Sequence, residues 1–303
     1  MNAQLSVIVT TYDWPAAVDL VLRALLEGRD GELEIIVAED GEGSATAGVV
    51  QRHQEQTDIR IAHVTQPDLG WRKSRILDLG ALESRGDYLV FLDGDCIPRT
   101  GFLRAVQRAA LPGWFLGGKR LHLNRALTQR VLDEDAAPWR WSTPRLLLAH
   151  ATGQFDATRE TAHPGLLVPL RDRGRPWRPS VREFRVPFEA YGFFFGVSRG
   201  NLERVNGFDL RFVGWGGEDE DIAARLRRIG LRCGWPGPRA TLLHLWHPEQ
   251  KGLMPSNKPL VRDTLASSHV EAVEGLRELA SEVDQASAKR VGASSASSEP
   301  ENR

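Results

Sequence analysis

The sequence predicts an α/β protein with a mostly parallel central sheet flanked by helices, and three observations lead to this prediction. Short apolar runs alternate with segments of helical periodicity through the first hundred residues. The runs are rich in β-branched residues, as strands buried on both faces are. Their spacing leaves room for one helix between successive strands, which is typical of parallel sheets with helices on both faces.

The elements follow one another in a regular order. Leu5–Thr10 predicts the first strand. A helix begins at Pro15, because proline is favoured in a first turn, and ends at Gly28. Further strands are expected at Leu33–Asp40, Ile59–Thr65 and Asp87–Asp95, with helices at Ala45–Gln56 and Lys73–Ser84 between them.

Regular structure returns in the last hundred residues. Strands are expected at Tyr191–Arg199 and Thr241–His247, and helices at Glu218–Ile229 and Val270–Val283. Between the two regular parts lies an arginine- and tryptophan-rich stretch, 119–188, with little periodicity, which predicts an irregular insert. We therefore predict one domain over residues 1–285 and a disordered Ser/Ala/Glu-rich tail over 286–303.

The composition is that of an ordinary soluble protein. Of the 303 residues 41% are hydrophobic and 26% charged, and the net charge of −1 gives no sign of nucleic-acid binding. The two cysteines lie far apart, which predicts no disulfide framework and a reducing cytoplasm. No window approaches the ~20 apolar residues of a membrane span. We expect a cytoplasmic protein, with contact to a membrane surface left open.

Polar side chains follow several of the predicted strands. Thr10, Asp40 and the pair Asp93 and Asp95 stand where the first, second and fourth strands end. In parallel sheets ligands bind beyond the carboxyl ends of the strands, so these groups should share one edge. This convergence is the first indication of a functional site.

The pair Asp93 and Asp95 ends the most apolar strand. Alternate residues of a strand share a face, so both carboxylates can point at one cation. Mg²⁺ and Mn²⁺ prefer such oxygen ligands and complete their shell with substrate phosphates. The alternative is a solvated Asp-Gly-Asp turn, which is common in loops. Cys96 lies beside the two acids, which raise the pKa of a thiol, so we do not expect it to act as a nucleophile.

The run Trp215–Asp221 places four acids at the start of a helix, after Gly216 and Gly217. Acids in a first turn are favoured by the helix dipole alone, which is the structural alternative. Two glycines let a ligand approach the backbone closely, and a tryptophan face is a typical platform for a sugar ring. One acid that the helix terminus keeps ionised would suit removal of a proton from a hydroxyl group.

His244 and His247 lie near the end of the last predicted strand. A single histidine is more often structural than a ligand, but an Asp-x-Asp pair alone offers a metal few ligands, and an imidazole would favour Mn²⁺ over Mg²⁺. Residues three apart lie on opposite faces of a strand, so one of the two is expected to bind. The sequence does not decide between them.

Two segments resemble known enzymes. VIVTTY, AEDG and GWRKSRILDLGALESRGDYLVFLDGDCIP resemble the family 2 glycosyltransferases, which have the GT-A nucleotide-diphospho-sugar transferase fold. FFFGVSRGNLERVNGFDLRFVGWGGEDEDIAARLRRIG resembles the catalytic segment of β-1,4-galactosyltransferases, N-acetylgalactosaminyltransferases and chondroitin-type polymerases. The resemblance implies a nucleotide-binding half, 1–118, and a catalytic, acceptor-binding half, 189–285. The Phe195-Gly196 pair replaces the Gly-Gly of the galactosyltransferases, which leaves the donor sugar open.

The resemblance also implies a role for each matching residue of the nucleotide and metal sites. The uracil and ribose pocket would be lined by Thr10, Tyr12 and Asp40, with Arg72 and Lys73 near the base or the diphosphate. Asp93 would contact the ribose or the metal, and Asp95 would bind the metal together with His244 or His247.

In the catalytic half, the resemblance implies that Asp219 is the general base. Glu218 and Asp221 would hold the acceptor, while Trp215, Gly216 and Gly217 would shape the junction of donor and acceptor. The expected activity is an inverting, metal-dependent transfer of a hexose or N-acetylhexosamine from a UDP-sugar to a hydroxyl group, on a glycan or other glycoconjugate. Two alternatives are a nucleotidyltransferase that forms an activated sugar, and a non-catalytic module that binds nucleotide-sugars.

Overall fold

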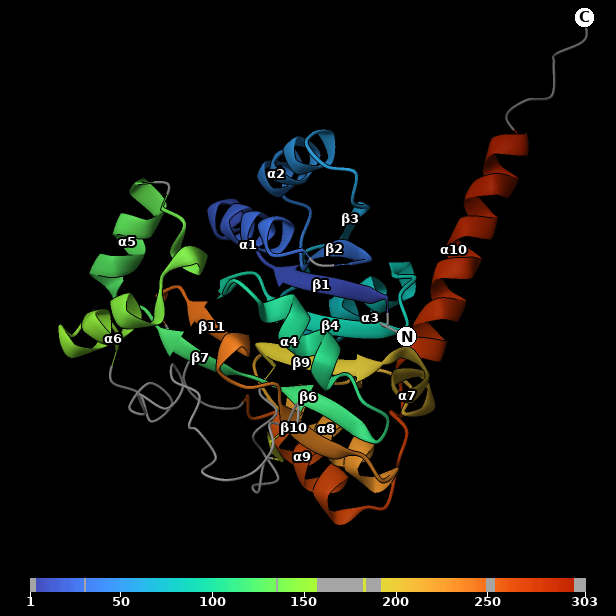
Figure 1. Ribbon diagram of the computed structural model, residues 1–303. Helices are drawn as coiled ribbons and strands as arrows, with labels where there is room; N and C mark the ends of the chain where they lie inside the picture. Colours follow the sequence, from blue (N-terminus) through green and yellow to red (C-terminus); the bar gives the residue numbers. More distant parts are fainter. Residues whose placement is uncertain are drawn as a thin grey trace, which may run out of the picture.

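The computed structural model describes residues 4–29, 31–134, 136–156, 182–183, 192–248 and 254–296. Their main feature is an eight-stranded sheet with helices on both faces (Figure 1). Its strands, in spatial order, are β3 (Ile61–Thr65), β2 (Leu33–Glu39), β1 (Leu5–Thr11), β4 (Tyr88–Asp93), β9 (Phe194–Ser198), β6 (Trp114–Gly117), β10 (Arg232–Trp235) and β8 (Arg182–Glu183).

The direction of the strands fixes where a ligand can bind. The four strands from β3 to β4 are parallel, β9 is antiparallel to both of its neighbours, and β6 and β10 again run parallel. Every residue of β1 is buried, as expected of a central strand with helices on both faces. The predicted mostly parallel sheet is confirmed, and the ends of β1, β2 and β4 share one edge.

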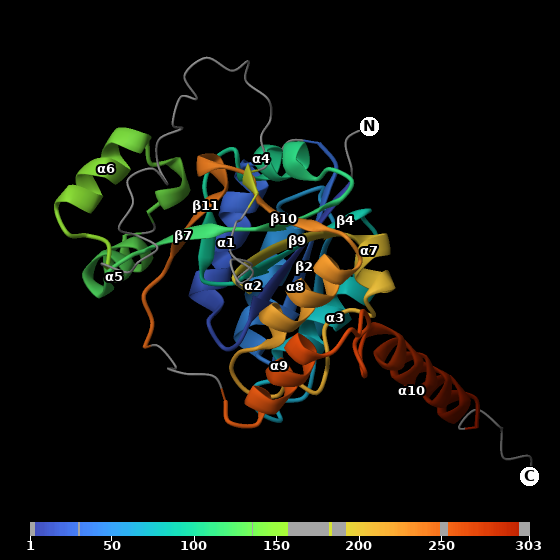
Figure 2. The same cartoon turned by 90° about the horizontal axis from the view of Figure 1, so that it is seen from below.

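The helices divide between the two faces of this sheet. Figure 1 shows α1 (Pro15–Glu27) and α2 (Ser44–Glu55) on one side, and α3 (Lys73–Glu83) on the other. Figure 2 shows α8 (Glu218–Arg228) and α9 (Asn257–Ala266) beside α3. The remaining helices are α4 (Phe102–Ala109), α5 (Arg125–Asp133), η1 (Pro138–Arg140), α6 (Thr143–Ala151), α7 (Arg199–Arg204), η3 (Pro238–Ala240) and α10 (Leu276–Ala296).

A three-stranded sheet brings distant parts of the chain together. In it β11 (Thr241–His244) lies between β5 (Cys96–Pro98) and β7 (Lys119–His122). The register sets His244 opposite Cys96 on one side and opposite His122 on the other. The end of β11 is thereby held against the turn that carries Asp95, where the Leu245 amide donates to the Asp95 carbonyl at 3.0 Å.

The strand predicted over Asp87–Asp95 ends earlier, at Asp93, and a turn at Gly94 and Asp95 leads into β5. The Gly94 amide donates to the Thr10 carbonyl at 2.7 Å, and a Cβ atom at Gly94 would lie 2.8 Å from that oxygen. This close approach to β1 turns the chain, so Asp93 and Asp95 do not share a strand face.

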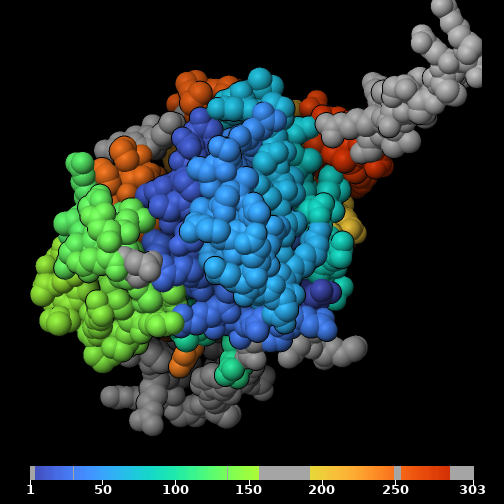
Figure 3. Space-filling model, turned by 90° about the horizontal axis from the view of Figure 1, so that it is seen from above, coloured from blue at the N-terminus to red at the C-terminus, as the bar shows by residue number. Residues whose placement is uncertain are grey.

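The segment predicted as an irregular insert is partly regular. Within residues 119–156 the structure forms β7, α5, η1 and α6, and α5 and α6 make a lobe beside α1 and α2 (Figure 3). Both helices are capped, since Asn124 accepts from the Leu127 amide and Ser142 accepts from the Arg145 amide. Residues 157–181 and 184–188 of the predicted insert lie outside the described residues.

The C-terminal helix also differs from the prediction. It begins at Leu276 rather than Val270, because the Ala272 and Leu276 amides donate to the carbonyls of Val205 and Asn206 instead of forming a helical turn. It packs on α3, where Arg75 and Glu282 form an ion pair of 2.6 Å, and it continues to Ala296, past residue 286 where disorder was predicted. No helix of the described residues has the length and apolar character of a membrane span.

Candidate active site

The first part of the site lies at the end of β4, where an ion pair joins Asp93 to the first residue of α3. The Lys73 Nζ atom is 2.6 Å from Asp93 Oδ1, and the Thr10 hydroxyl donates to the same carboxylate at 3.2 Å. Burial opposes the charge on Lys73, yet the neighbouring carboxylates, Asp93 first among them, raise its pKa above the ordinary value. Lys73 is therefore a fixed positive charge at the sheet edge.

Gly192 connects this lysine to the start of α8. Its carbonyl accepts from Lys73 Nζ at 3.4 Å, and its amide donates to Asp219 Oδ2 at 3.0 Å. A Cβ atom at this position would lie 3.4 Å from Lys73 Nζ and 3.5 Å from Glu218 Oε1. These are ordinary contact distances, so Lys73, Glu218 and Asp219 surround one small region next to Gly192. We call these three residues the acid–lysine group.

Two carboxyl groups of the acid–lysine group are hard to ionise. Burial first, and then the like charge of Asp219, raise the pKa of Glu218 to about 7. Burial also raises the pKa of Asp219, against the lowering effects of the Gly192 amide and of Lys73. Asp219 is half-buried, and desolvation of its carboxyl group outweighs the lowering effect of the amide hydrogen bonds, so its pKa lies above the ordinary value of an aspartate.

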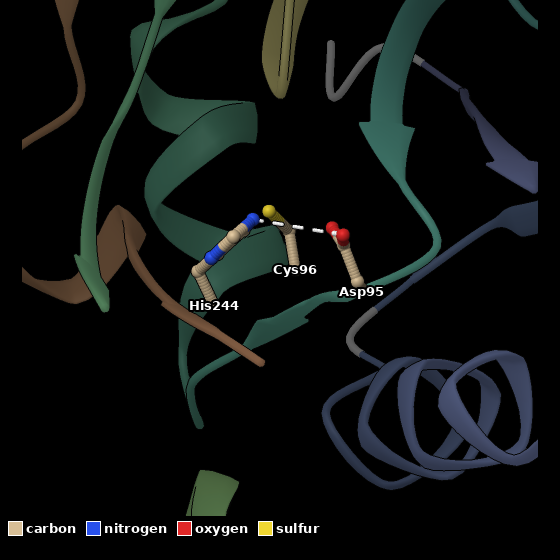
Figure 4. Close-up of side chains that lie close together, drawn as sticks. All are labelled: Asp95, Cys96 and His244. Atoms are coloured by element: carbon tan, nitrogen blue, oxygen red, sulfur yellow. Dashed lines mark ion pairs between the residues drawn. The ribbon is translucent and has the colours of Figure 1, made fainter. Parts of the chain in front are cut away.

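The second part of the site is formed by Asp95, His244 and His247, which we call the Asp–His group. Figure 4 shows the carboxylate of Asp95 and the imidazole of His244 pointing toward one another next to Cys96. The Nε2 atoms of His244 and His247 lie 3.6 Å and 3.2 Å from Asp95 Oδ2. Both histidines reach the same carboxylate because β11 ends at His244, so the expectation that strand alternation separates them is wrong.

Asp95 and His244 have the protonation states of metal ligands. Burial opposes the charge on Asp95, but His244 and His247 lower the pKa of its carboxyl group below the usual range. Burial lowers the pKa of His244 to about 3, which keeps this imidazole neutral. The hydrogen bond with Asp95 raises the pKa of His247 instead.

The Asp–His group also has the geometry to hold a divalent cation. Donor atoms of Asp95, Cys96 and His244 all lie within 4.8 Å of one another. Asp95 Oδ1 and His244 Nδ1 are buried and have no hydrogen-bond partner among the described residues. A carboxylate and one or two imidazoles suit Mn²⁺ among the metals that oxygen and nitrogen ligands bind. Burial and the nearby Asp95 raise the pKa of the Cys96 thiol, which makes it the weakest of these donors.

Two residues that the sequence did not indicate join the two groups. Phe193 follows Gly192, and its carbonyl accepts from the Asp93 amide at 3.1 Å. The guanidinium of Arg120, on β7, lies 4.3 Å from the centre of the Phe193 ring. Arg120 also lowers the pKa of Asp95, so its positive charge lies close to the Asp–His group. In the sequence, Arg120 is indicated only by its place in Lys119-Arg120-Leu121-His122, after a buried strand.

The predicted nucleotide-binding residues lie at the ends of β1 and β2. Asp40 is buried, and its carboxylate accepts from the Arg72 amide at 2.7 Å and from the side chain of Gln66. Tyr12 is 59% exposed and donates to Asp68 at 3.1 Å, with its ring 3.8 Å from a Cβ atom built at Gly41. Thr10, Tyr12, Asp40 and Arg72 thus lie along one edge, next to Lys73.

Among the residues predicted at the loop before α8 and at the start of α8, Asp221 is placed differently from the prediction. Gly216 and Gly217 both have positive φ, at 87° and 101°, so the loop needs glycine there. Trp215 is 37% exposed beside them. Asp221 is buried, and its oxygens bind Arg225 at 2.5 Å and the Thr264 hydroxyl at 2.7 Å. These contacts tie α8 to α9 and leave Asp221 inside the protein, away from the acceptor position predicted for it.

Comparison with known proteins matches both halves of the chain. The model of the family "Glycosyl transferase family 2" matches residues 6–155, and that of the "N-terminal domain of galactosyltransferase" matches residues 178–248. Validoxylamine A glucosyltransferase of Streptomyces hygroscopicus is 28% identical over 256 residues, which cover 75% of this chain and 52% of that protein. The chain thus spans about half the length of this relative.

The second match is shorter and closer. β-1,4-Galactosyltransferase 2 of Mus musculus is 40% identical over 57 residues, which are 18% of this chain and 15% of that protein. Among solved structures, a mannosyltransferase of Pyrobaculum calidifontis in complex with GDP-Man and Mn²⁺ superposes with a TM-score of 0.54 at 16% identity. The alignment covers 98% of this chain and 80% of that one. Residues 6–155 therefore belong to the family 2 glycosyltransferases, and the chain has the GT-A fold.

Proposed function

We propose that the chain is an inverting, metal-dependent glycosyltransferase that moves a hexose or N-acetylhexosamine from a UDP-sugar to a hydroxyl acceptor. One observation carries the proposal: the acid–lysine group and the Asp–His group are distinct in their chemistry, yet they are connected through the adjacent residues Gly192 and Phe193. A base and a site for a leaving diphosphate are the two things that such a transfer requires.

Asp219 acts as the general base in this proposal. A carboxylate with a raised pKa holds a proton more strongly than an ordinary aspartate, which brings its basicity closer to what a general base needs at neutral pH. Its Oδ2 atom is oriented by the Gly192 amide. Asp219 takes the proton of the acceptor hydroxyl, whose oxygen forms the bond to the anomeric carbon as the bond to the diphosphate breaks. This single displacement inverts the anomeric centre.

Glu218 has a supporting role in the same group. It is buried, and its raised pKa lets it hold a proton near neutral pH. A protonated carboxyl group can donate a hydrogen bond to an acceptor oxygen while leaving Asp219 as the charged partner of Lys73. The positive charge of Lys73 favours the ionised form of Asp219.

The leaving diphosphate is stabilised at the Asp–His group. Asp95, His244 and His247 would hold Mn²⁺, which supplies positive charge to phosphate oxygens when bound. Arg120 adds a guanidinium, which the Phe193 ring holds in place and which suits phosphate oxygens geometrically. A neutral His244 and a charged Asp95 are the forms that a metal binds.

The nucleoside binds at the ends of β1 and β2. Asp40, fixed by the Arg72 amide and Gln66, presents a buried carboxylate that can accept from the N–H of uracil. Tyr12 offers an exposed aromatic face next to it. Thr10 and Asp93 then lie on the side toward the ribose, between the base and Lys73.

A donor screen tests the proposal. The purified full chain would be incubated with Mn²⁺ and, separately, with UDP-, GDP- and dTDP-sugars, and release of the nucleoside diphosphate would be measured. We expect release from one or more UDP-sugars and none in the Asp219→Asn variant. Release from GDP- or dTDP-sugars alone would show that the nucleotide assignment is wrong.

A further inference from the structure

Five large apolar side chains are exposed together beside the acid–lysine group. They come from three separate loops. Removing their apolar surface from water would be energetically favourable. Their exposed fractions are 71% for Leu69, 41% for Trp71, 47% for Val213, 37% for Trp215 and 40% for Met254. We call this set the apolar rim.

Backbone contacts hold the three loops of the apolar rim together. The Gly214 amide donates to the Trp71 carbonyl at 2.8 Å, and the Met254 amide donates to the Trp215 carbonyl at 3.1 Å. A Cβ atom at Gly214 would lie 2.7 Å from Met254 Cγ, so the methionine packs directly on this loop. The three loops that carry the five exposed side chains are therefore held side by side.

The apolar rim is continuous with the proposed catalytic residues. Trp71 precedes Lys73 by two residues, and Lys73 shares the Gly192 backbone with Asp219. Trp215 precedes Gly216 and Gly217, which lead into α8 and its first-turn acids. An acceptor whose hydroxyl group lies at Asp219 would therefore have the apolar rim beside it.

Two charged side chains of the loops that carry the apolar rim already have partners. Asp68 accepts from the Tyr12 hydroxyl at 3.1 Å, and Arg211 forms a 2.7 Å ion pair with Asp209. A polar ligand would have to compete with these internal contacts for its hydrogen bonds. An apolar ligand would lose nothing by lying between them.

The kind of apolar side chain narrows the ligand further. Tryptophan faces can stack on a sugar ring, but Leu69, Val213 and Met254 are aliphatic and give a sugar neither stacking nor hydrogen bonds. What aliphatic side chains bury favourably is alkyl or aryl surface. Contiguous apolar surface of this kind on a folded protein marks a binding site.

We propose that the acceptor carries an apolar aglycone, which lies on the apolar rim while the acceptor hydroxyl faces Asp219. The proposal rests on the glycosyltransferase function proposed above and names the acceptor class. An oligosaccharide acceptor without an aglycone would leave the aliphatic part of the rim in water.

Two commercially available glycosides test this proposal by binding alone. Methyl β-D-glucoside and octyl β-D-glucoside, the latter below its micelle concentration, would be titrated into the full chain with UDP and Mn²⁺ in a calorimeter. Each methylene removed from water strengthens binding by about fourfold, so octyl glucoside should bind at least about tenfold more tightly than the methyl glycoside.

Variants then locate the effect. Leu69→Ser/Val213→Ser should abolish the preference for the octyl glycoside and leave UDP affinity unchanged. Leu111→Ser is the matched control, because Leu111 is 42% exposed but lies just before β6, whose first residue is at the opposite edge of the sheet. It should retain the full preference.

The outcomes separate this proposal from the proposed function. Octyl glucoside that binds no more tightly than methyl glucoside, or not measurably, overturns the aglycone assignment. So does a preference that persists in Leu69→Ser/Val213→Ser. Failure of UDP to bind the unmodified chain with Mn²⁺ would instead contradict the UDP-sugar donor of the proposed function.

Discussion

The acid–lysine group and the Asp–His group each place a carboxylate beside basic side chains, yet the pKa values move in opposite directions. In the acid–lysine group two carboxyl groups share one lysine, and burial raises the pKa of both. In the Asp–His group one carboxylate has two imidazoles and Arg120 near it, and its pKa falls. Asp219, with few basic neighbours, is thus suited to taking up a proton. Asp95, with several, is suited to remaining an ionised ligand.

The Asp–His group should show the largest effect. Chelation of divalent cations, or Asp95→Ala, should abolish turnover, because the leaving diphosphate would lose its metal and Asp95 is the most acidic of the proposed ligands. Nucleoside diphosphate release measured with excess EDTA checks the expectation. Readdition of Mn²⁺ should restore the unmodified chain but not Asp95→Ala. Full activity in excess chelator would show that turnover does not require a divalent cation.

The acid–lysine group should show the next largest effect. Asp219→Asn keeps size and hydrogen bonding but removes basicity, and loss of a general base costs about 10²–10⁴ in rate. Glu220→Gln is the control, since Glu220 is the next residue of the same helical turn, half-buried and equally near the dipole. We expect nearly full transfer from Glu220→Gln. The reverse result would place the base one residue later in α8.

Arg120 separates the effect of charge from that of the metal at the Asp–His group, because it would contact the diphosphate without binding the metal. Arg120→Met should weaken UDP binding by about tenfold or more, as charge-assisted contacts to phosphate do, and should affect uridine binding little. Arg145→Met is the matched control, since Arg145 lies over Trp141 at the same distance of 4.3 Å, on α6. Equal losses for UDP and uridine would mean that Arg120 only supports the fold.

The smallest effect concerns stability. Because the pKa of Glu218 is raised from 4.5 to about 7 in the folded chain, the folded state binds more protons than the unfolded state between these values. The free energy of unfolding should therefore fall as pH rises from about 4.5 to about 7, by up to about 3 kcal/mol from this group. Chemical denaturation in EDTA at several pH values should show a shallower fall for Glu218→Gln. Identical slopes for the two proteins would contradict the raised pKa.

The sequence predicted the sheet well because its strands are strongly patterned. Leu5–Thr10 and Leu33–Asp40 are apolar runs bounded by turn signals, and both appear with nearly the predicted limits. The lobe of α5 and α6 was missed although Asn124 and Ser142 are ordinary helix caps. Its many arginines weakened the apolar periodicity that identifies a helix.

The sequence also indicated most of the site, but not its geometry. Asp95 was expected together with one of the two histidines, and the end of β11 at His244 had to be seen before both could be brought to one carboxylate. Arg120 lies in a segment without a motif and Gly192 just before a matched segment, and only the pairing of β7 with β11 and of β9 with β4 brings them to the site. The pKa of Asp219 depends on burial, which no local pattern reports.

The separate roles of the two groups are tested most directly by UDP binding and sugar transfer measured on the same three proteins. UDP would be titrated calorimetrically in Mn²⁺ into the unmodified chain, Asp95→Ala and Asp219→Asn, and transfer would be measured in parallel. We predict that Asp95→Ala loses both UDP affinity and transfer, whereas Asp219→Asn loses transfer alone and binds UDP as the unmodified chain does. Equal UDP affinity in both variants, or its loss in both, would contradict the division of labour between the two groups.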